Sequence, residues 1–479
     1  MDGNETKKLL ESTLAKGTVL AERWSKIPGK LIRGFEESGE VNFMEGVEGD
    51  YDKAVMAQLF ENTLHWLRGL DESTRTLQVG SFEKFVFPIL RAVMANLVAS
   101  ELVTVSPLDA PTGLVFYFDV LYGSNKGNVS RGSKMYDVRT GPSKSYHYTD
   151  EIVEEESVGT GDGLVVNFHG TLGYLPVRPG TLLITDGNQR ATDNGNGVMV
   201  GDLAANGTID YATGGYNITF AAPPAGTDPI TASYEYNSEA NADTPEIDLQ
   251  LTSAPVTART QKLRARWSLE AQQDFQSYHG INAEVELVAF MANEIAKELN
   301  YKIIRHIRQV ASAGNVTWDR TPPQGVPWIW HKESLYDALV QQSNLIFSKT
   351  QRAVGNWIVG DVAFCNVVET ISKFKGTQLG NTSPSGLAGV RKIGQVGEFT
   401  VFKDPGYPTG EFLMGHKGSS FLDTGYIYAP YLQLFTTGTI TLDDMISRKG
   451  MGMRTGLKVV NSGMYATGNI TQSGGPFGP

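Results

Sequence analysis

The sequence has almost no cysteine, no apolar run long enough to cross a bilayer, and no secretory signal. Cys365 is the single cysteine among 479 residues, which excludes an intrachain disulfide and a multi-cysteine metal site. It stands in the apolar run 362–368, where a buried structural thiol is expected. The chain start, Met-Asp-Gly-Asn-Glu-Thr-Lys-Lys, has no apolar core, and no stretch approaches the roughly 18 apolar residues of a membrane span. We expect a protein that is soluble and intracellular where it is made.

Charged residues are also scarce, at 19% against a common value of about 25%. Glycine is abundant, with 53 residues, and aromatic residues reach 10%, a composition too apolar for a disordered chain. The formal net charge of −11 argues against a protein that coats nucleic acid through bulk charge. Segment 150–245 carries 14 acidic residues against Arg178 and Arg190, so the rest of the chain is nearly neutral.

The local signatures of known reaction classes are absent. The seven histidines are scattered, and there is no HExxH, GxSxG or GxxxxGK[ST] pattern. Glu154–Glu156 is expected to be a solvated charge run, and His279 a structural residue at a helix entry. Asp193–Gly197 is expected to be a hairpin turn, because it lacks the alternating ligands and distal Glu of a calcium loop. The sequence therefore predicts no enzyme, no metal and no cofactor.

Hydrophobic periodicity predicts a first strand at 114–122, which is β-branched and aromatic throughout. Its partner is expected at 261–269, as the second arm of a long hairpin. In that second segment Lys262, Arg264 and Arg266 share one face, with Trp267 on the other. A solvated, salt-bridged strand face is the alternative to a binding surface for these three cations.

The remaining segments predict a mixed architecture. Segment 150–245 has short strands separated by Gly, Asn, Asp and Pro turns, which is typical of a small all-β sandwich or barrel. A long amphipathic helix is expected from the cap Asn282 to Val310. After residue 327 strands and helices alternate, with a helix capped by Asp361, and 424–467 predicts further strands. Shorter helices are expected from Asn4, from Asp50 and from Pro88.

Several segments, taken in order, resemble the major capsid proteins of tailed bacteriophages of the T-even myovirus type. The resemblance lies in 87–99, 105–116, 263–274, 279–287, 356–360 and 415–431. The Pro-Thr-Gly at 111–113 and the Ala-Pro-Tyr at 429–431 are short signatures, and their order and spacing make the combination specific. Members of this family commonly lose an N-terminal propeptide.

The resemblance implies an α+β chain with the HK97 capsid fold. Its expected parts are an extended N-terminal arm with short helices at 1–80, the start of the P-domain and the outgoing E-loop strand at 81–149, an inserted acidic all-β, sandwich-like domain at 150–245, the returning E-loop strand at 246–281, the spine helix of the P-domain at 282–326, an α/β A-domain at 327–440, and closing P-domain strands with the C-terminal tail at 441–479.

The resemblance also implies a structural protein of the virion, assembled in the bacterial host cytoplasm. Copies would form hexamers and pentamers of an icosahedral or prolate head around double-stranded DNA, with weak, non-specific DNA contact and no membrane. Portal, scaffold, vertex and decoration proteins are further implied partners. Contacts between subunits are expected at Phe116, Tyr117, Phe118, Lys262, Arg264, Arg266 and Trp267. The alternatives are a phage tail or fibre-associated protein whose β module binds carbohydrate, and an enzyme with an α/β domain.

Overall fold

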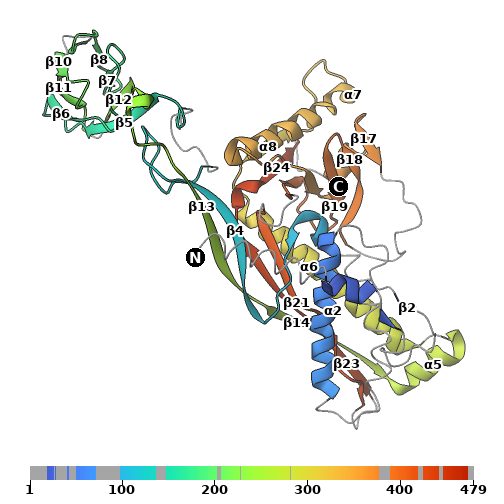
Figure 1. Cartoon of the computed structure of the whole chain (residues 1–479). Coiled ribbons are helices and arrows are strands. Elements are labelled where there is room, and N and C mark those ends of the chain that lie inside the picture. Colours follow the sequence, from blue (N-terminus) through green and yellow to red (C-terminus); the bar gives the residue numbers. More distant parts are fainter. Residues whose placement is uncertain are drawn as a thin grey trace. The chain divides into compact units, whose positions relative to one another are not determined.

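The chain folds into two compact units with an α+β organisation, as expected (Figure 1). Unit 1 comprises Met1–Tyr117 and Ser253–Pro479, and unit 2 comprises Phe118–Thr252. The computed structural model describes residues 19–25, 27–28, 40–41, 50–71, 98–135, 147–201, 206–226, 228–280, 282–376, 389–418, 424–441 and 446–472. The helix expected from Asn4, and most of the one expected from Pro88, lie outside the described residues.

Unit 2 contains one antiparallel sheet of eight strands in the order β5-β12-β7-β8-β9-β10-β11-β6. Burial alternates along the strands, so that Ile230, Ala232 and Tyr234 point into the core of the unit. The bounds are β5 Ile152–Thr160, β6 Asn167–Thr171, β7 Leu183–Thr185, β8 Arg190–Asp193, β9 Val198–Gly201, β10 Asn206–Ile209, β11 Gly215–Thr219 and β12 Pro229–Glu235, with the 3-10 turn η3 at Ser238–Ala240.

The strands of unit 2 differ from expectation in two ways. They form one continuous sheet and not the two separate sheets of a sandwich, because each of β7 to β10 pairs with the next strand along the chain. The charge run at Glu154–Glu156, expected to be a solvated face, lies within β5, where all three residues are half-buried. Glu156 accepts hydrogen bonds from the hydroxyl of Tyr234 at 2.6 Å and the amide of Gly173 at 2.9 Å. Because protein donors bind this carboxylate, an acidic residue fits a strand here.

Unit 1 contains a five-stranded sheet whose main order is β14-β23-β21-β3, with β22 beside β23. One face packs against helix α6, which the sequence predicted correctly: the side chain of Asn282 accepts from the amide of Glu284, and Leu299, Ile303 and Ile307 are fully buried. The bounds are β3 Thr104–Val105, β14 Arg259–Ser268, β21 Tyr426–Thr436, β22 Ile440–Thr441, β23 Ile446–Val459 and α6 Ala283–Val310.

Helix α2 (Asp50–Asp71) covers part of the same core. Its residues Leu59 and Phe60 are fully buried. The side-chain amide of Asn62 donates to the backbone carbonyls of Leu108 at 3.0 Å and Tyr431 at 2.9 Å. The helix expected from Asp50 is therefore present, and it belongs to the folded body of unit 1. Short elements nearby are α4 Ala99–Leu102, β1 Ile27–Pro28 and β2 Glu40–Val41.

The predicted long hairpin is wrong in its pairing. The first strand, β4 (Thr112–Tyr122), pairs with β13 (Ile247–Thr257), whereas β14 pairs with β23. The strand β13 lies in the segment 246–281 expected to hold the returning strand, but it was not predicted as the partner of 114–122. Its apolar alternation at Ile247, Leu249 and Leu251 is short and ends before Pro255. Leu269 is also not a strand residue, since it begins helix α5 (Leu269–His279), which ends at Gly280 in the left-handed conformation.

The rest of unit 1 is built on a seven-stranded mixed sheet in the order β15-β24-β20-β16-β19-β18-β17. Asp361 caps α9 by accepting from the amides of Ala363 and Phe364, as predicted. Cys365 is fully buried, and this burial raises the pKa of its thiol, which fits a structural role. The bounds are β15 Asn315–Asp319, α7 Trp328–His331, α8 Ser334–Thr350, β16 Trp357–Gly360, α9 Val362–Val368, β17 Phe374–Gly376, β18 Arg391–Val396, β19 Phe399–Lys403, β20 Glu411–Gly415, the 3-10 turn η4 Ser462–Met464 and β24 Tyr465–Thr471.

Candidate functional site

Three of the expected contact residues form an exposed row of cations at the edge of the five-stranded sheet. β14 is the terminal strand of that sheet, and its pleat places Lys262, Arg264 and Arg266 on one side. All three side chains are exposed, and none has an ion pair or hydrogen bond with another described residue. We call these three residues the basic strip.

The neighbouring strand offers the basic strip no negative charge. In the register of β14 with β23, Lys262 lies opposite Gly452, Arg264 opposite Gly450 and Arg266 opposite Arg448. Two glycines and an arginine therefore occupy the positions from which a cross-strand carboxylate would normally pair with these cations. Like charges directly opposite each other in a sheet are unfavourable, so this face is suited to an anionic partner from elsewhere.

Trp267 points to the opposite side of β14 from the basic strip. Its side chain is 7% exposed, and its indole nitrogen donates to the side-chain carbonyl of Gln272 at 3.0 Å. Trp267 thus attaches α5 to the end of β14 within one chain. Its contact role with another subunit stays a prediction.

Phe116, Tyr117 and Phe118 lie apart from the basic strip, on β4, which pairs with β13 in a separate two-stranded sheet. Phe116 and Tyr117 are half-buried. The boundary between the two units falls between Tyr117 and Phe118. These aromatic residues therefore mark the place where β4 leaves unit 1.

Sequence reasoning missed an acidic counterpart of the basic strip in unit 2. Glu239, Asp243, Glu246 and Asp248 are all exposed, and their carboxylates have no ion pair or hydrogen bond among the described residues. We call these four residues the acidic strip. Glu246 directly precedes β13 and Asp248 lies within it. The two-residue spacing of Glu246 and Asp248 was the signal in the sequence, and it repeats the spacing of the basic strip.

A buried cation holds the base of unit 2 together. The Lys126 side chain is 3% exposed, and its ammonium donates to the backbone carbonyls of His147 at 2.8 Å, Tyr148 at 3.2 Å and Asp150. Burial lowers the pKa of Lys126, with the charge of Asp150 acting in the opposite direction. We call this arrangement the Lys126 clasp. It fixes segment 147–150 against 123–129.

The clasp includes an imidazole and carboxylate pair. His147 Nδ1 is hydrogen-bonded to the Asp150 carboxylate, and Nε2 lies 3.5 Å from Glu154. The hydrogen bond to Asp150 raises the pKa of His147, and the negative charges of Asp150 and Glu154 add to this effect. Burial by itself raises the pKa of Asp150, but its hydrogen bonds with His147 and the amide of Ile152 bring it below the ordinary value. Both shifts favour the charged forms of His147 and Asp150.

Exposed aromatic side chains on α7 were also missed. Ile329 and Trp330 are 61% and 72% exposed, while the neighbouring His331 stacks on Trp318 with 5.1 Å between the ring centroids. A short helix that is held in place by His331 and exposes two large apolar side chains is typical of a contact surface. The sequence signal was the run Trp-Ile-Trp after Pro327.

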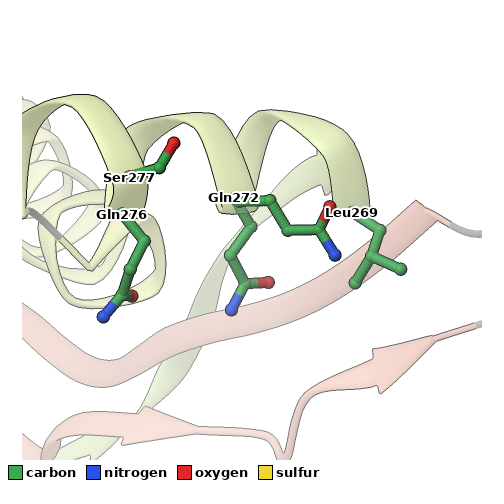
Figure 2. A pocket seen from close by; sticks show the side chains of 5 residues that line it. Leu269, Gln272, Gln276 and Ser277 are labelled. Atoms are coloured by element: carbon green, nitrogen blue, oxygen red, sulfur yellow. The ribbon is translucent and has the colours of Figure 1, made fainter.

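The hollows of the surface contain no reactive arrangement. A groove along α5 has a volume of about 410 Å³. Figure 2 shows uncharged side chains that line it, such as Gln272 and Gln276. A second hollow, in unit 2, has a volume of about 780 Å³ and is lined in part by Lys126 and Glu156. Both side chains are already hydrogen-bonded within the protein. Neither hollow brings a nucleophile and a base together.

Searches of the described residues for other functions give negative findings. No group of three or more His, Cys, Asp or Glu in the described ranges could hold a metal ion. Asp193 accepts hydrogen bonds from Tyr211 and from the amides of Gly180 and Gly195, and the chain turns from β8 to β9 there. The hairpin prediction for Asp193–Gly197 is confirmed. None of the described helices is long and apolar enough to span a membrane.

The comparison with protein families is decisive. Residues 79–475 match the model of the Gp23 major capsid protein family, which covers most of the chain. The chain belongs to this family. The resemblance to T-even capsid proteins is thereby confirmed, and membership gives the chain a structural role in a bacteriophage capsid.

Individual relatives of the Gp23 family agree with this assignment. The chain is 26% identical over 392 residues to a major capsid protein of Vibrio phage KVP40, an alignment that covers 73% of this chain and 70% of the relative. It is 23% identical over 379 residues to a major capsid protein of Enterobacteria phage T4, again with 73% and 70% covered. The relatives therefore share sequence with most of the chain.

Solved capsid structures are more distant. One match, described as the capsid of Myoviridae phage XM1, has 9% identity and a TM-score of 0.31, and covers 66% of this chain and 89% of that chain. Another, described as the capsid of an empty GTA particle, has 13% identity and a TM-score of 0.32, and covers 49% and 80%. The assignment rests on the family match alone.

Proposed function

We propose that this chain is the shell subunit of a bacteriophage head with the HK97-type fold. Copies would assemble into hexamers and pentamers that enclose double-stranded DNA in an icosahedral or prolate shell. The match of residues 79–475 to a major capsid protein family carries the proposal. Catalysis plays no part in it, because a shell subunit acts through contacts with other copies.

The parts of the chain correspond to parts of that fold in this proposal. The five-stranded sheet with α6 would be the P-domain and its spine, the seven-stranded sheet the A-domain, and β4 with β13 the E-loop. Unit 2 would be an insertion at the E-loop. The long paired strands β4 and β13 support this assignment, because an extended ribbon can reach and contact a neighbouring subunit.

The contact residues stay as first proposed, with the basic strip as the best-supported group. Lys262, Arg264 and Arg266 are exposed and lie together without a negative partner among the described residues. The proposed contact role of Phe116, Tyr117 and Phe118 rests on their place in β4. That of Trp267 rests on its place near the end of β14. The acidic segment 150–245 would face outward or bridge adjacent capsomers, away from the packaged DNA, because like charges repel.

Further partners belong to the same proposal. Portal, scaffold, vertex and decoration proteins would join the shell during assembly in the host cytoplasm, and contact with DNA would be weak and non-specific. A tail or fibre-associated carbohydrate binder is the competing function, and unit 2 would be its binding module. Family membership favours the capsid protein.

Electron microscopy of the purified full-length protein tests the proposal. Closed shells, or hexameric and pentameric capsomers, are the expected result. A protein that stays monomeric over a wide concentration range and binds glycans would contradict it. A map of the shell would also place segment 150–245, and its position against the DNA would refute the outward orientation.

A further inference from the structure

The acidic strip and the basic strip are opposite in sign, and parts of them have equal spacing. Glu246 and Asp248 are two residues apart at the start of β13, and Lys262, Arg264 and Arg266 are each two residues apart on β14. Extended chain rises about 3.3 Å per residue, so Glu246 and Asp248 are about 6.6 Å apart, as are neighbouring cations of the basic strip. Two rows with equal spacing and opposite sign can align charge by charge.

Both strips lack a partner within the described part of the chain. The carboxylates of the acidic strip and the cations of the basic strip are exposed and make no ion pair there. Some charges nearby do find partners: the exposed Arg178 pairs with Glu151 and Glu235, and the half-buried Lys449 pairs with Glu284. The chain thus leaves unpaired the two rows that fit each other.

We infer that the acidic strip of one copy binds the basic strip of a second copy. This inference rests on the proposed function, because it requires that copies assemble. The contact uses two different surfaces of the same chain, so it is a head-to-tail contact, which closes into a ring when the rotation between copies permits it. Hexamers and pentamers are such rings.

A second copy fits the basic strip better than DNA does. Three cations neutralise about three phosphates, which gives weak binding that fails at moderate salt. The acidic strip, in contrast, is present on every copy at the same concentration as the basic strip. The contact should set which surfaces meet, and it should weaken as salt rises.

Charge reversal tests the pairing. In the full-length protein, E246K/D248K reverses the acidic strip and K262E/R264E reverses the basic strip. Each variant alone places like charges together, so the protein concentration needed for assembly should rise roughly tenfold or more, since two exposed pairs are lost and replaced by repulsion. Assembly is measured by sedimentation velocity and electron microscopy at graded protein concentrations.

Mixing the two variants separates a contact between copies from one within a chain. In an alternating ring, the reversed acidic strip of the first variant meets the reversed basic strip of the second, and the unchanged strips also meet. An equimolar mixture should therefore form hexamers, in which the two variants can alternate, at a concentration close to that of the wild type, although neither variant does so alone. A contact within one chain would not be restored by mixing.

Matched controls change the net charge equally at other exposed sites. D274K/E398K matches the first variant and K302E/K375E matches the second, because all four side chains are exposed and form no ion pair in the described part of the structure. Both controls should assemble like the wild type. Their failure together with the strip variants would mean that net charge, and not the pairing, controls assembly, and would overturn the inference.

The remaining outcomes are also decisive. Strip variants that assemble at the wild-type concentration would overturn the pairing and leave the proposed function intact. If those variants assembled normally but lost retention of duplex DNA, the basic strip would be a nucleic-acid contact and the pairing would again be wrong. Wild-type protein that never associates would overturn the pairing and the proposed function together.

Discussion

The Lys126 clasp should contribute measurably to the stability of unit 2. Replacing Lys126 with Met keeps an unbranched side chain of similar length and removes the ammonium. The carbonyls of His147, Tyr148 and Asp150 then lose their donor, at about 1 kcal/mol each. Relief of the desolvation that lowers the lysine pKa offsets part of this loss. The net loss is about 2 kcal/mol, or a factor of about 30 in the local opening equilibrium.

Hydrogen exchange of the full-length protein, followed by mass spectrometry, measures this loss. The amide of Asn128 donates to Glu154 at 2.9 Å and that of Val129 to Lys126 at 3.0 Å, so both report on the clasp. Their exchange in K126M should accelerate about 30-fold, while the amides of α6 stay unchanged.

Lys134→Met is the matched control, because Lys134 belongs to the same unit and forms a partly exposed ion pair with Asp119 at 3.3 Å. It should change the exchange of Asn128 and Val129 less than threefold. If K126M also stays within threefold of the wild type, the three carbonyls gain little from the ammonium and the reasoning is wrong.

Three further predictions concern unit 1. Gly456→Ala should lower the free energy of unfolding by about 1–3 kcal/mol in denaturant titration, because an added Cβ would lie 2.3 Å from Val256 Cγ1. Asn62→Ala should accelerate the exchange of α2 amides about tenfold, since two hydrogen bonds to carbonyls are lost. Burial alone raises the pKa of Glu284, but hydrogen bonds from Lys449 and Thr439 lower it overall. The ionised Glu284 therefore stabilises the fold above the ordinary pKa of 4.5, and this stabilisation is lost as pH falls through the lowered pKa of the folded state. Glu284→Gln should flatten the pH dependence of the melting temperature in that acid range.

The helices were predictable from sequence because their signals are local. Asn282 and Asp361 cap the helices as expected, and the helix expected from Asn282 to Val310 matches α6, although Val285 at the start of its apolar stripe is exposed. Helix α5 was missed because Leu269 follows Leu263, Ala265 and Trp267 in the alternation of β14. In the structure Ser268 already caps the new helix, and Leu269 is its first residue. A change of period within a few residues leaves too short a pattern to recognise.

Strand pairing was the least predictable feature, because it depends on contacts between distant segments. β14 and 114–122 both have strong alternation, and pairing them follows from pattern alone. The structure instead pairs β14 with β23 and pairs 114–122 with β13. The alternation of Ile247, Leu249 and Leu251 indicates that β13 is a strand, but an alternating pattern does not say which other strand is its partner.

The net charge of a segment does not show which of its carboxylates are free to bind another copy. Segment 150–245 is strongly acidic, yet several of its carboxylates are already bound within unit 2: Glu156 by Tyr234, and Asp193 by Tyr211. The carboxylates that remain without a partner in the described structure include Glu246 and Asp248, which lie beyond that segment. Net charge therefore identifies the acidic unit, whereas the ability to bind another copy depends on which carboxylates the fold leaves unpaired, and that requires the hydrogen bonds of the folded chain.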